Sequence, residues 1–195
     1  ALGYTMIYGI IKLINFAHGD IYMVGAYIGF FSITQAHLSI VPSLLISLVV
    51  TGFLGMVVER LAYKPLRHAP RISVLITAIG VSFFLEYTTM YFVSPTPRTF
   101  PAMYGDVAVN IGGIVINGQQ MLILGITAVL MVILTYIVQK TKTGKAMRAA
   151  SFDTETAELM GINSDRIISI TFGIGSALAA VAGVLVGIYY NSIDP

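Results

Sequence analysis

Five long apolar stretches, separated by short polar segments, run along this chain. They cover roughly residues 16–34, 40–58, 72–93, 121–138 and 167–190, and a shorter apolar run covers residues 1–11. A helix needs about 20 apolar residues to cross a bilayer, and the stretches do not alternate polar and apolar residues as the strands of a membrane barrel do. The pattern therefore predicts an all-α, polytopic transmembrane bundle of about five spans with a partial helix at the N-terminus.

Composition supports a membrane protein. Of the 195 residues, 56% are hydrophobic and only 10% are charged, whereas a soluble domain carries about 25% charged residues. The net charge of +2 is too small to indicate a nucleic-acid partner, and the absence of cysteine excludes disulfides and zinc-thiolate sites. Because the first apolar run stops at Lys12 and the last ends just before Pro195, we interpret residues 1–195 as a single, partial transmembrane domain of a longer protein.

The basic residues predict the orientation of the spans. They gather in two segments that are separated by two spans: Arg60, Lys64, Arg67 and Arg71 in the first, and Lys140, Lys142, Lys145, Arg148 and Arg166 in the second. Both segments are therefore expected on the cytosolic side, together with Lys12. Residues 35–39 and 94–120 are then external, and in the second of these Val107 to Ile111 and Ile114 to Ile116 predict a small β-hairpin.

A polar segment, Ile-Asn-Phe-Ala-His-Gly-Asp at residues 14–20, interrupts the first apolar region. Asn15, His18 and Asp20 are costly in lipid unless they face protein or a water-filled path. The segment is either a corner between two helices or a break inside one, and a polar break at membrane depth is typical of a substrate path. Two roles stay open: these side chains cap and satisfy helix ends, or they line the path directly.

Two carboxylates stand near or inside the predicted spans. Glu86 lies about 14 positions into its span, roughly 21 Å from the cytosolic side, where it either serves transport or simply reaches water or a neighbouring tyrosine. Glu59 lies at the cytosolic interface, where we expect it to pair at the surface with Arg60 and Lys64.

Residues 140–166 form a long cytosolic segment, whereas most helix–helix connections take about 2–8 residues. A short helix is expected at residues 144–150. A second begins after Asp153 as N-cap, with Glu155 in its first turn, and ends near Gly161. A folded segment of mixed charge favours a protein partner, and the alternative is a basic loop on anionic lipid.

Small residues recur at helical spacing in two of the predicted spans. Gly25 and Gly29 form one pair, and Gly175, Ala179, Gly183 and Gly187 form a longer series. Such faces let helices approach closely in lipid. They indicate packing inside one subunit or, alternatively, a subunit interface.

Enzymatic chemistry is not indicated. Thr143-Gly144-Lys145 lacks the earlier glycine and the following Ser or Thr of a phosphate-binding loop. His18 and Asp20 are two positions apart and do not share a helix face, so no metal site is expected, and the chain holds no known nucleophile motif. No catalytic residue, metal or cofactor is predicted, and a membrane enzyme using His18, Asp20 and Glu86 is the weakest alternative.

Three stretches together resemble a known family, the H-type permease subunits of bacterial branched-chain amino-acid ABC importers. The first is residues 8–27 around the polar segment. The second is residues 59–80, with Glu-Arg-Leu-Ala-Tyr-Lys-Pro-Leu-Arg and Leu-Ile-Thr-Ala-Ile-Gly. The third is residues 143–187, with Thr-Gly-Lys-Ala-Met-Arg-Ala, Asp153, Ala157, Gly161-Ile162 and Thr171-Phe172.

The resemblance implies a multi-pass permease of the bacterial inner membrane that imports leucine, isoleucine or valine. Its implied partners are a second permease, two cytosolic ATPase subunits that use the ATP, and an external binding protein. Residues 140–166 would be the ATPase-coupling loop, with candidate residues Gly144, Lys145, Arg148, Asp153, Ala157 and Gly161. The alternatives are a related importer of urea or short amides, and an ion-coupled transporter in which His18, Asp20 or Glu86 titrates.

Overall fold

The computed structural model describes residues 2–11, 15–67, 69–100, 108–111 and 114–195. In these ranges the helices are α1 (Leu2–Ile11), α2 (His18–Thr34), α3 (Ile40–Val58), α4 (Arg71–Phe92), α5 (Gly118–Lys140), α6 (Lys142–Phe152), α7 (Thr154–Leu159) and α8 (Ser164–Tyr190). A π-helix, η1 (Glu59–Tyr63), and a 3-10 turn, η2 (Lys64–Leu66), follow α3 directly. The all-α prediction is confirmed.

Four of the described helices are long and apolar enough to cross a membrane: Ile40–Leu66, Ile72–Phe92, Gly118–Lys140 and Ser164–Tyr190. The fifth predicted span, α2, has 17 residues, which is about 26 Å and less than a hydrocarbon layer of about 30 Å. Residues 15–17 form a turn, so α2 begins at His18 and not at residue 16 as predicted.

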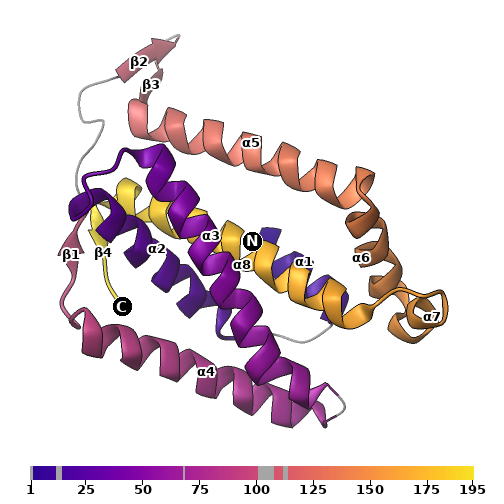
Figure 1. Ribbon diagram of the computed structural model, residues 1–195. Coiled ribbons are helices and arrows are strands. Elements are labelled where there is room, and N and C mark those ends of the chain that lie inside the picture. The colour runs from indigo at the N-terminus through magenta and orange to yellow at the C-terminus, as the bar shows by residue number, and fades with distance from the viewer. Residues whose placement is uncertain (1, 12–14, 68, 101–107, 112–113) are drawn as a thin grey trace.

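The bundle is built around α8. Helices α1, α2 and α3 pack directly against it, and Figure 1 shows α4 and α5 on opposite sides of this central group. Small residues make the packing close: a Cβ added at Gly25 would lie 2.5 Å from the Cα of Ala180, and one added at Gly3 would lie 2.5 Å from the carbonyl oxygen of Gly175. Within the described residues, the Gly25 and Gly175 faces therefore serve packing inside one chain.

Buried apolar side chains form two clusters at different depths. The outer cluster includes Tyr27, Phe30, Phe100, Val184 and Ile188. The inner cluster joins residues of α1, η1, α4, α6 and α8: Ile7, Ile10, Val58, Tyr63, Val74, Ala78, Met147, Ala150, Ile167, Ile168 and Phe172. Since α6 contributes to the inner cluster, the segment after α5 is packed against the bundle.

The two basic segments lie at the same end of the molecule, as their charges predict. The Nζ of Lys64, after α3, lies 2.7 Å from a carboxylate oxygen of Asp165, in the first turn of α8. Figure 1 places α6 and α7 at this end as well. Lys12 lies outside the described residues.

The opposite end carries the short strands. Strand β1 (Arg98–Thr99) pairs with β4 (Ser192–Ile193). Strands β2 (Ala108–Ile111) and β3 (Ile114–Asn117) form the predicted antiparallel pair, with Ala108 opposite Asn117. Val107, Gly112 and Gly113 of the predicted hairpin lie outside the described residues.

Candidate functional site

Residues 15–17 of the polar segment lie at a corner between α1 and α2, which run in opposite directions, and Ile14 lies outside the described residues. Ile10 of α1 shares the inner cluster with Ile167 and Ile168 at the beginning of α8, so α1 runs toward the N-terminal end of α8. Helix α2 runs the other way, with Gly25 on Ala180 and Gly29 on Val184. His18 is seven residues before Gly25, and Gly173 is seven residues before Ala180. Because both helices rise by the same distance per residue, His18 lies at the same depth as Gly173, about 14 Å from the start of α8. The corner therefore lies inside the bilayer.

Each polar side chain of the corner has a different environment. Asn15 is 3% exposed, and its Oδ1 accepts a hydrogen bond from the Tyr63 hydroxyl at 2.5 Å. The Ser82 hydroxyl of α4 donates to Asp20. Asp20 does not cap α2, because the N-cap is Ala17 and its side chain makes no capping bond. The ring of His18 lies 5.6 Å from that of Tyr4.

A pocket of about 500 Å³ opens beside His18, between α1, α2, α5 and α8. Its polar side chains are His18, Tyr22 and Thr127, and its apolar lining comes from Leu2, Leu130, Leu178, Ala179, Val181, Ala182 and Leu185. A mostly apolar cavity with a few polar groups is the usual form of a small-molecule site. It suits a ligand with an aliphatic side chain and a polar end.

A second pocket continues along the same face of α2 and α8. It measures about 250 Å³ and is lined by Tyr22, Ala26, Gly183, Gly187 and Asp194 among others. Tyr22 lines both pockets, so it stands between the cavity beside His18 and the end that carries β4. Sequence reasoning missed Tyr22, although it stands one helical turn after His18 and so shares its face.

The four residues predicted for the substrate path are not gathered at one place. His18 lines the pocket of about 500 Å³, whereas Asp20 lies on the side of α2 that meets α4. Glu86 is one turn beyond Ser82 on α4, partly exposed. In the described parts of the chain, no three His, Asp or Glu side chains come together to hold a metal ion.

Helices α6 and α7 form a lobe at the end of the bundle that the charges predict to be cytosolic, and the lobe is defined here as residues 142–161. The Asp153 carboxylate accepts from the backbone N–H of Glu155 at 3.0 Å and of Thr156 at 3.2 Å, which confirms it as the N-cap. Gly161, with φ of +84°, ends the lobe in a conformation that favours glycine. The two predicted helices are therefore confirmed, although the first extends over Lys142–Phe152 and so is two residues longer at each end than predicted.

The predicted coupling residues divide into two groups by burial. Gly144 and Ala157 are buried against the rest of the chain, and Lys145, Arg148, Asp153 and Gly161 are exposed. The most exposed apolar side chains of the lobe were missed: Phe152 (85%), Leu159 (88%) and Met160 (80%). The sequence does hold a signal for them, since they are large apolar residues in an otherwise polar segment.

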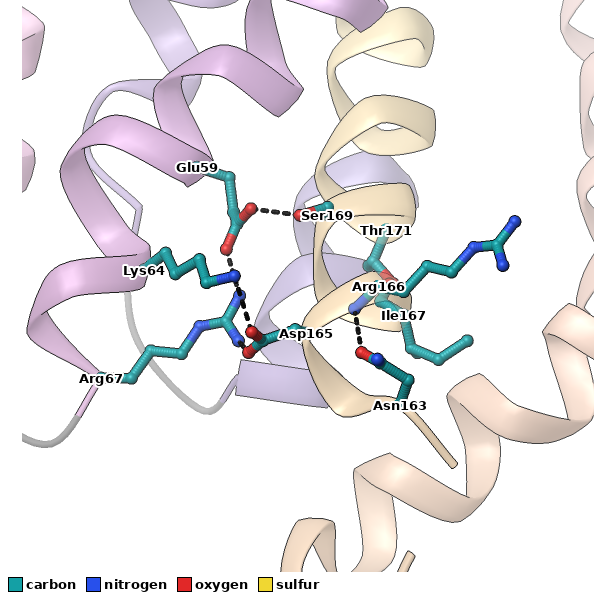
Figure 2. A network of polar contacts seen from close by, with 9 residues as sticks. All are labelled: Glu59, Lys64, Arg67, Asn163, Asp165, Arg166, Ile167, Ser169 and Thr171. Atoms are coloured by element: carbon teal, nitrogen blue, oxygen red, sulfur yellow. Dashed lines mark hydrogen bonds and ion pairs between the residues drawn. The ribbon is translucent and has the colours of Figure 1, made fainter. Parts of the chain in front are cut away.

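A polar network ties η1 to α8 (Figure 2). Glu59 is wholly buried, and it accepts hydrogen bonds from Arg67 and from the Ser169 hydroxyl. Arg67 also donates to Asp165, which Lys64 contacts from the surface. The expected surface pairing of Glu59 with Arg60 and Lys64 is wrong, because the π-helix turns Glu59 into the protein and leaves Arg60 exposed.

Comparison with known proteins identifies the family. The family model described as "Branched-chain amino acid transport system / permease component" matches residues 1–195. The chain belongs to this family of permeases. The permease protein BraD of the high-affinity branched-chain amino acid transport system of Pseudomonas aeruginosa is 42% identical, over 100% of this chain and 67% of its own length. LivH of Escherichia coli K12 is 39% identical and LivH of Salmonella typhimurium 38%, each over the same shares.

Membership of the permease family confirms several of the sequence predictions. The chain is a multi-pass membrane component of an ABC transport system, and it is not an enzyme. It spans about two thirds of the length of these relatives. No solved structure matches it.

Proposed function

We propose that this permease passes leucine, isoleucine or valine through the pocket beside His18. The observation that carries the proposal is the pocket itself, a cavity of about 500 Å³ at the level of a polar corner inside the bilayer. Its aliphatic wall matches the side chain of a branched amino acid. His18, Tyr22 and Thr127 offer polar contacts for the ammonium and carboxylate groups. The names of the relatives, all branched-chain amino acid permeases, support the same substrate class.

Energy enters through the cytosolic lobe. In this proposal Phe152, Leu159 and Met160 dock on an ATPase subunit, and the basic residues of α6 and the acidic residues of α7 set the orientation. Exposed large apolar side chains rimmed by charges are typical of protein interfaces. A second permease, two ATPase subunits and an external binding protein complete the importer.

Import by the reconstituted complex in proteoliposomes tests the substrate. The purified complex is expected to accumulate labelled leucine, isoleucine and valine only when ATP is supplied. Replacing Ala182 by Phe places a ring in the pocket and is expected to reduce uptake at least tenfold while the complex still assembles. Uptake of urea or short amides in place of these amino acids would contradict the proposal, as would uptake that persists without any ATPase subunit.

Co-purification tests the lobe. The Leu159→Ala variant removes an exposed side chain from the proposed docking surface, and at least a tenfold loss of bound ATPase is expected. Leu61→Ala is the matched control, because Leu61 is also exposed (74%) at the cytosolic end but lies outside the lobe. Equal recovery of ATPase with both variants would show that the lobe is not the docking surface.

A further inference from the structure

The π-helix η1 carries two buried polar side chains that the proposed transport function leaves unused. Glu59 at its start has no exposed surface and Tyr63 at its end is 5% exposed. A π-helical turn is a rare break in an α-helix and occurs frequently at functional sites. Here it joins α3 to the basic segment at the cytosolic end.

Glu59 connects this turn to the N-terminal end of α8. Its carboxylate accepts hydrogen bonds from Arg67 and Ser169, and Arg67 reaches Asp165 in the first turn of α8. Figure 2 shows the four side chains converging between the two elements, while Arg166 points away from them. Asp165 stands four residues after Gly161, so the network is close along the chain to the end of the lobe.

Tyr63 connects the same turn to the corner that holds His18. Its hydroxyl donates to Asn15 at 2.5 Å, and Asn15 stands three residues before His18 in the chain. Its ring lies 5.2 Å from that of Phe172 in α8. Tyr63 and Phe172 belong to the inner cluster, and Met147 and Ala150 of α6, each 2% exposed, belong to it as well.

Stability alone does not explain a buried carboxylate at this place. Replacing a buried ion pair by apolar side chains of similar volume is often neutral or stabilising, because the charges lose their hydration. The turn instead joins α8 through Glu59 and the corner through Tyr63, and Tyr63 belongs to the same buried cluster as Met147 and Ala150 of the lobe. Such an arrangement is suited to fix the relative positions of these elements. Coupling between distant sites travels through such packed and hydrogen-bonded contacts.

We propose that η1 is a joint that transmits displacement of the lobe to the pocket, with Glu59 and Tyr63 as its positioning residues. The inference rests on the proposed function, since it assumes an ATPase that moves the lobe and an amino acid that leaves the pocket. Neither residue touches the substrate. Both residues keep the corner at a fixed position relative to α8.

The number of amino acids imported per ATP hydrolysed is the decisive measurement, in proteoliposomes that contain the whole complex. Glu59→Gln removes the charge and keeps the shape, and Tyr63→Phe removes one hydrogen bond and keeps the ring. Arg60→Gln and Tyr136→Phe are the matched controls, because these side chains are exposed. We expect the first two variants to lower the ratio at least threefold and the controls to keep it.

A merely structural role would lower import and hydrolysis together with the amount of assembled complex, and the ratio would stay constant. A constant ratio overturns the proposal, and so does a decrease that the controls share. The double variant is expected to lower the ratio no further than the more affected single variant does, because both side chains serve one joint. Additive losses in the ratio overturn the joint.

If Glu59→Gln does not assemble, Ser169→Ala, which deletes one hydrogen bond to Glu59, takes its place with the same outcomes. Failure of the wild-type complex to import would instead refute the proposed function.

Discussion

The contact between α2 and α8 gives a sharp test of the packing at Gly25. In the Gly25→Ala variant, the new Cβ would lie 2.5 Å from both the Cα and the Cβ of Ala180, and 3.2 Å from the Thr51 hydroxyl oxygen. Carbon atoms in contact prefer about 3.5–4.0 Å, so α2 must move by roughly 1 Å away from α8. No flexible side-chain end is available to give way, because the nearest atoms belong to the backbone and to a Cβ.

The expected size of the effect follows from two opposing terms. Overpacking of a well-packed interior costs about 1–3 kcal/mol. Alanine in a helix interior is more favourable than glycine by about 0.5–1 kcal/mol. The net loss in the free energy of unfolding should therefore lie between about 0 and 2.5 kcal/mol, with a central value of about 1 kcal/mol. Gly80→Ala is the matched control: a Cβ at Gly80 on α4 meets nothing within 4 Å, so only the stabilising term applies.

Unfolding of the purified permease by sodium dodecyl sulfate in mixed micelles, followed by circular dichroism, measures both variants. We expect Gly25→Ala to unfold at a lower detergent fraction than the wild type, and Gly80→Ala to unfold at the same or a higher fraction. If Gly25→Ala proved as stable as Gly80→Ala, α2 and α8 would not approach as closely as this packing requires.

Two further substitutions test other parts of the fold. Gly161→Ala forces a side chain into a φ of +84° and should destabilise the lobe by about 1 kcal/mol, whereas Gly161→Asn should be tolerated better. Faster amide hydrogen exchange in α7 of the Gly161→Ala variant would report the loss. Equal exchange in both variants would contradict the expectation. Phe100→Ala empties a site that is 1% exposed between Gly187 and the ring of Phe30, and should cost about 3–5 kcal/mol in the same detergent titration. Phe92→Ala, at a side chain 78% exposed, should cost little, and similar losses for both would refute the burial of Phe100.

The long helices and the lobe could be predicted because their signals are local. Hydropathy over about 20 residues defines a span, and the Asp153 cap involves residues at most three positions away. The beginning of α2 was predicted less well. Apolar Phe16 and Ala17 continue the hydrophobic pattern, but they belong to the turn that precedes the helix.

The buried polar contacts could not be predicted, because their partners are distant in the sequence. Glu59 and Ser169 are 110 positions apart, and Asn15 and Tyr63 are 48 apart. Near Glu59 the sequence shows Arg60 and Lys64, which favour surface pairing, whereas its observed partner Arg67 reaches it only after η1 and η2 have turned the chain. The walls of the pocket come from four helices, so no local pattern could reveal it.

Polar side chains within the bundle join its helices, and one of them, His18, also borders the pocket. Lipid gives no hydrophobic drive for helices to associate, so polar contacts help to decide which helices meet. Three such contacts each join separate elements of the described chain: Asp20 with Ser82, Asn15 with Tyr63, and Glu59 with Ser169. The Nδ1 of His18, like the Nδ2 of Asn15, has no hydrogen-bond partner among the described residues, and the ring of His18 also borders the pocket. A polar atom left unpaired in a low-dielectric site is costly, so these two buried nitrogens reduce the stability of the corner.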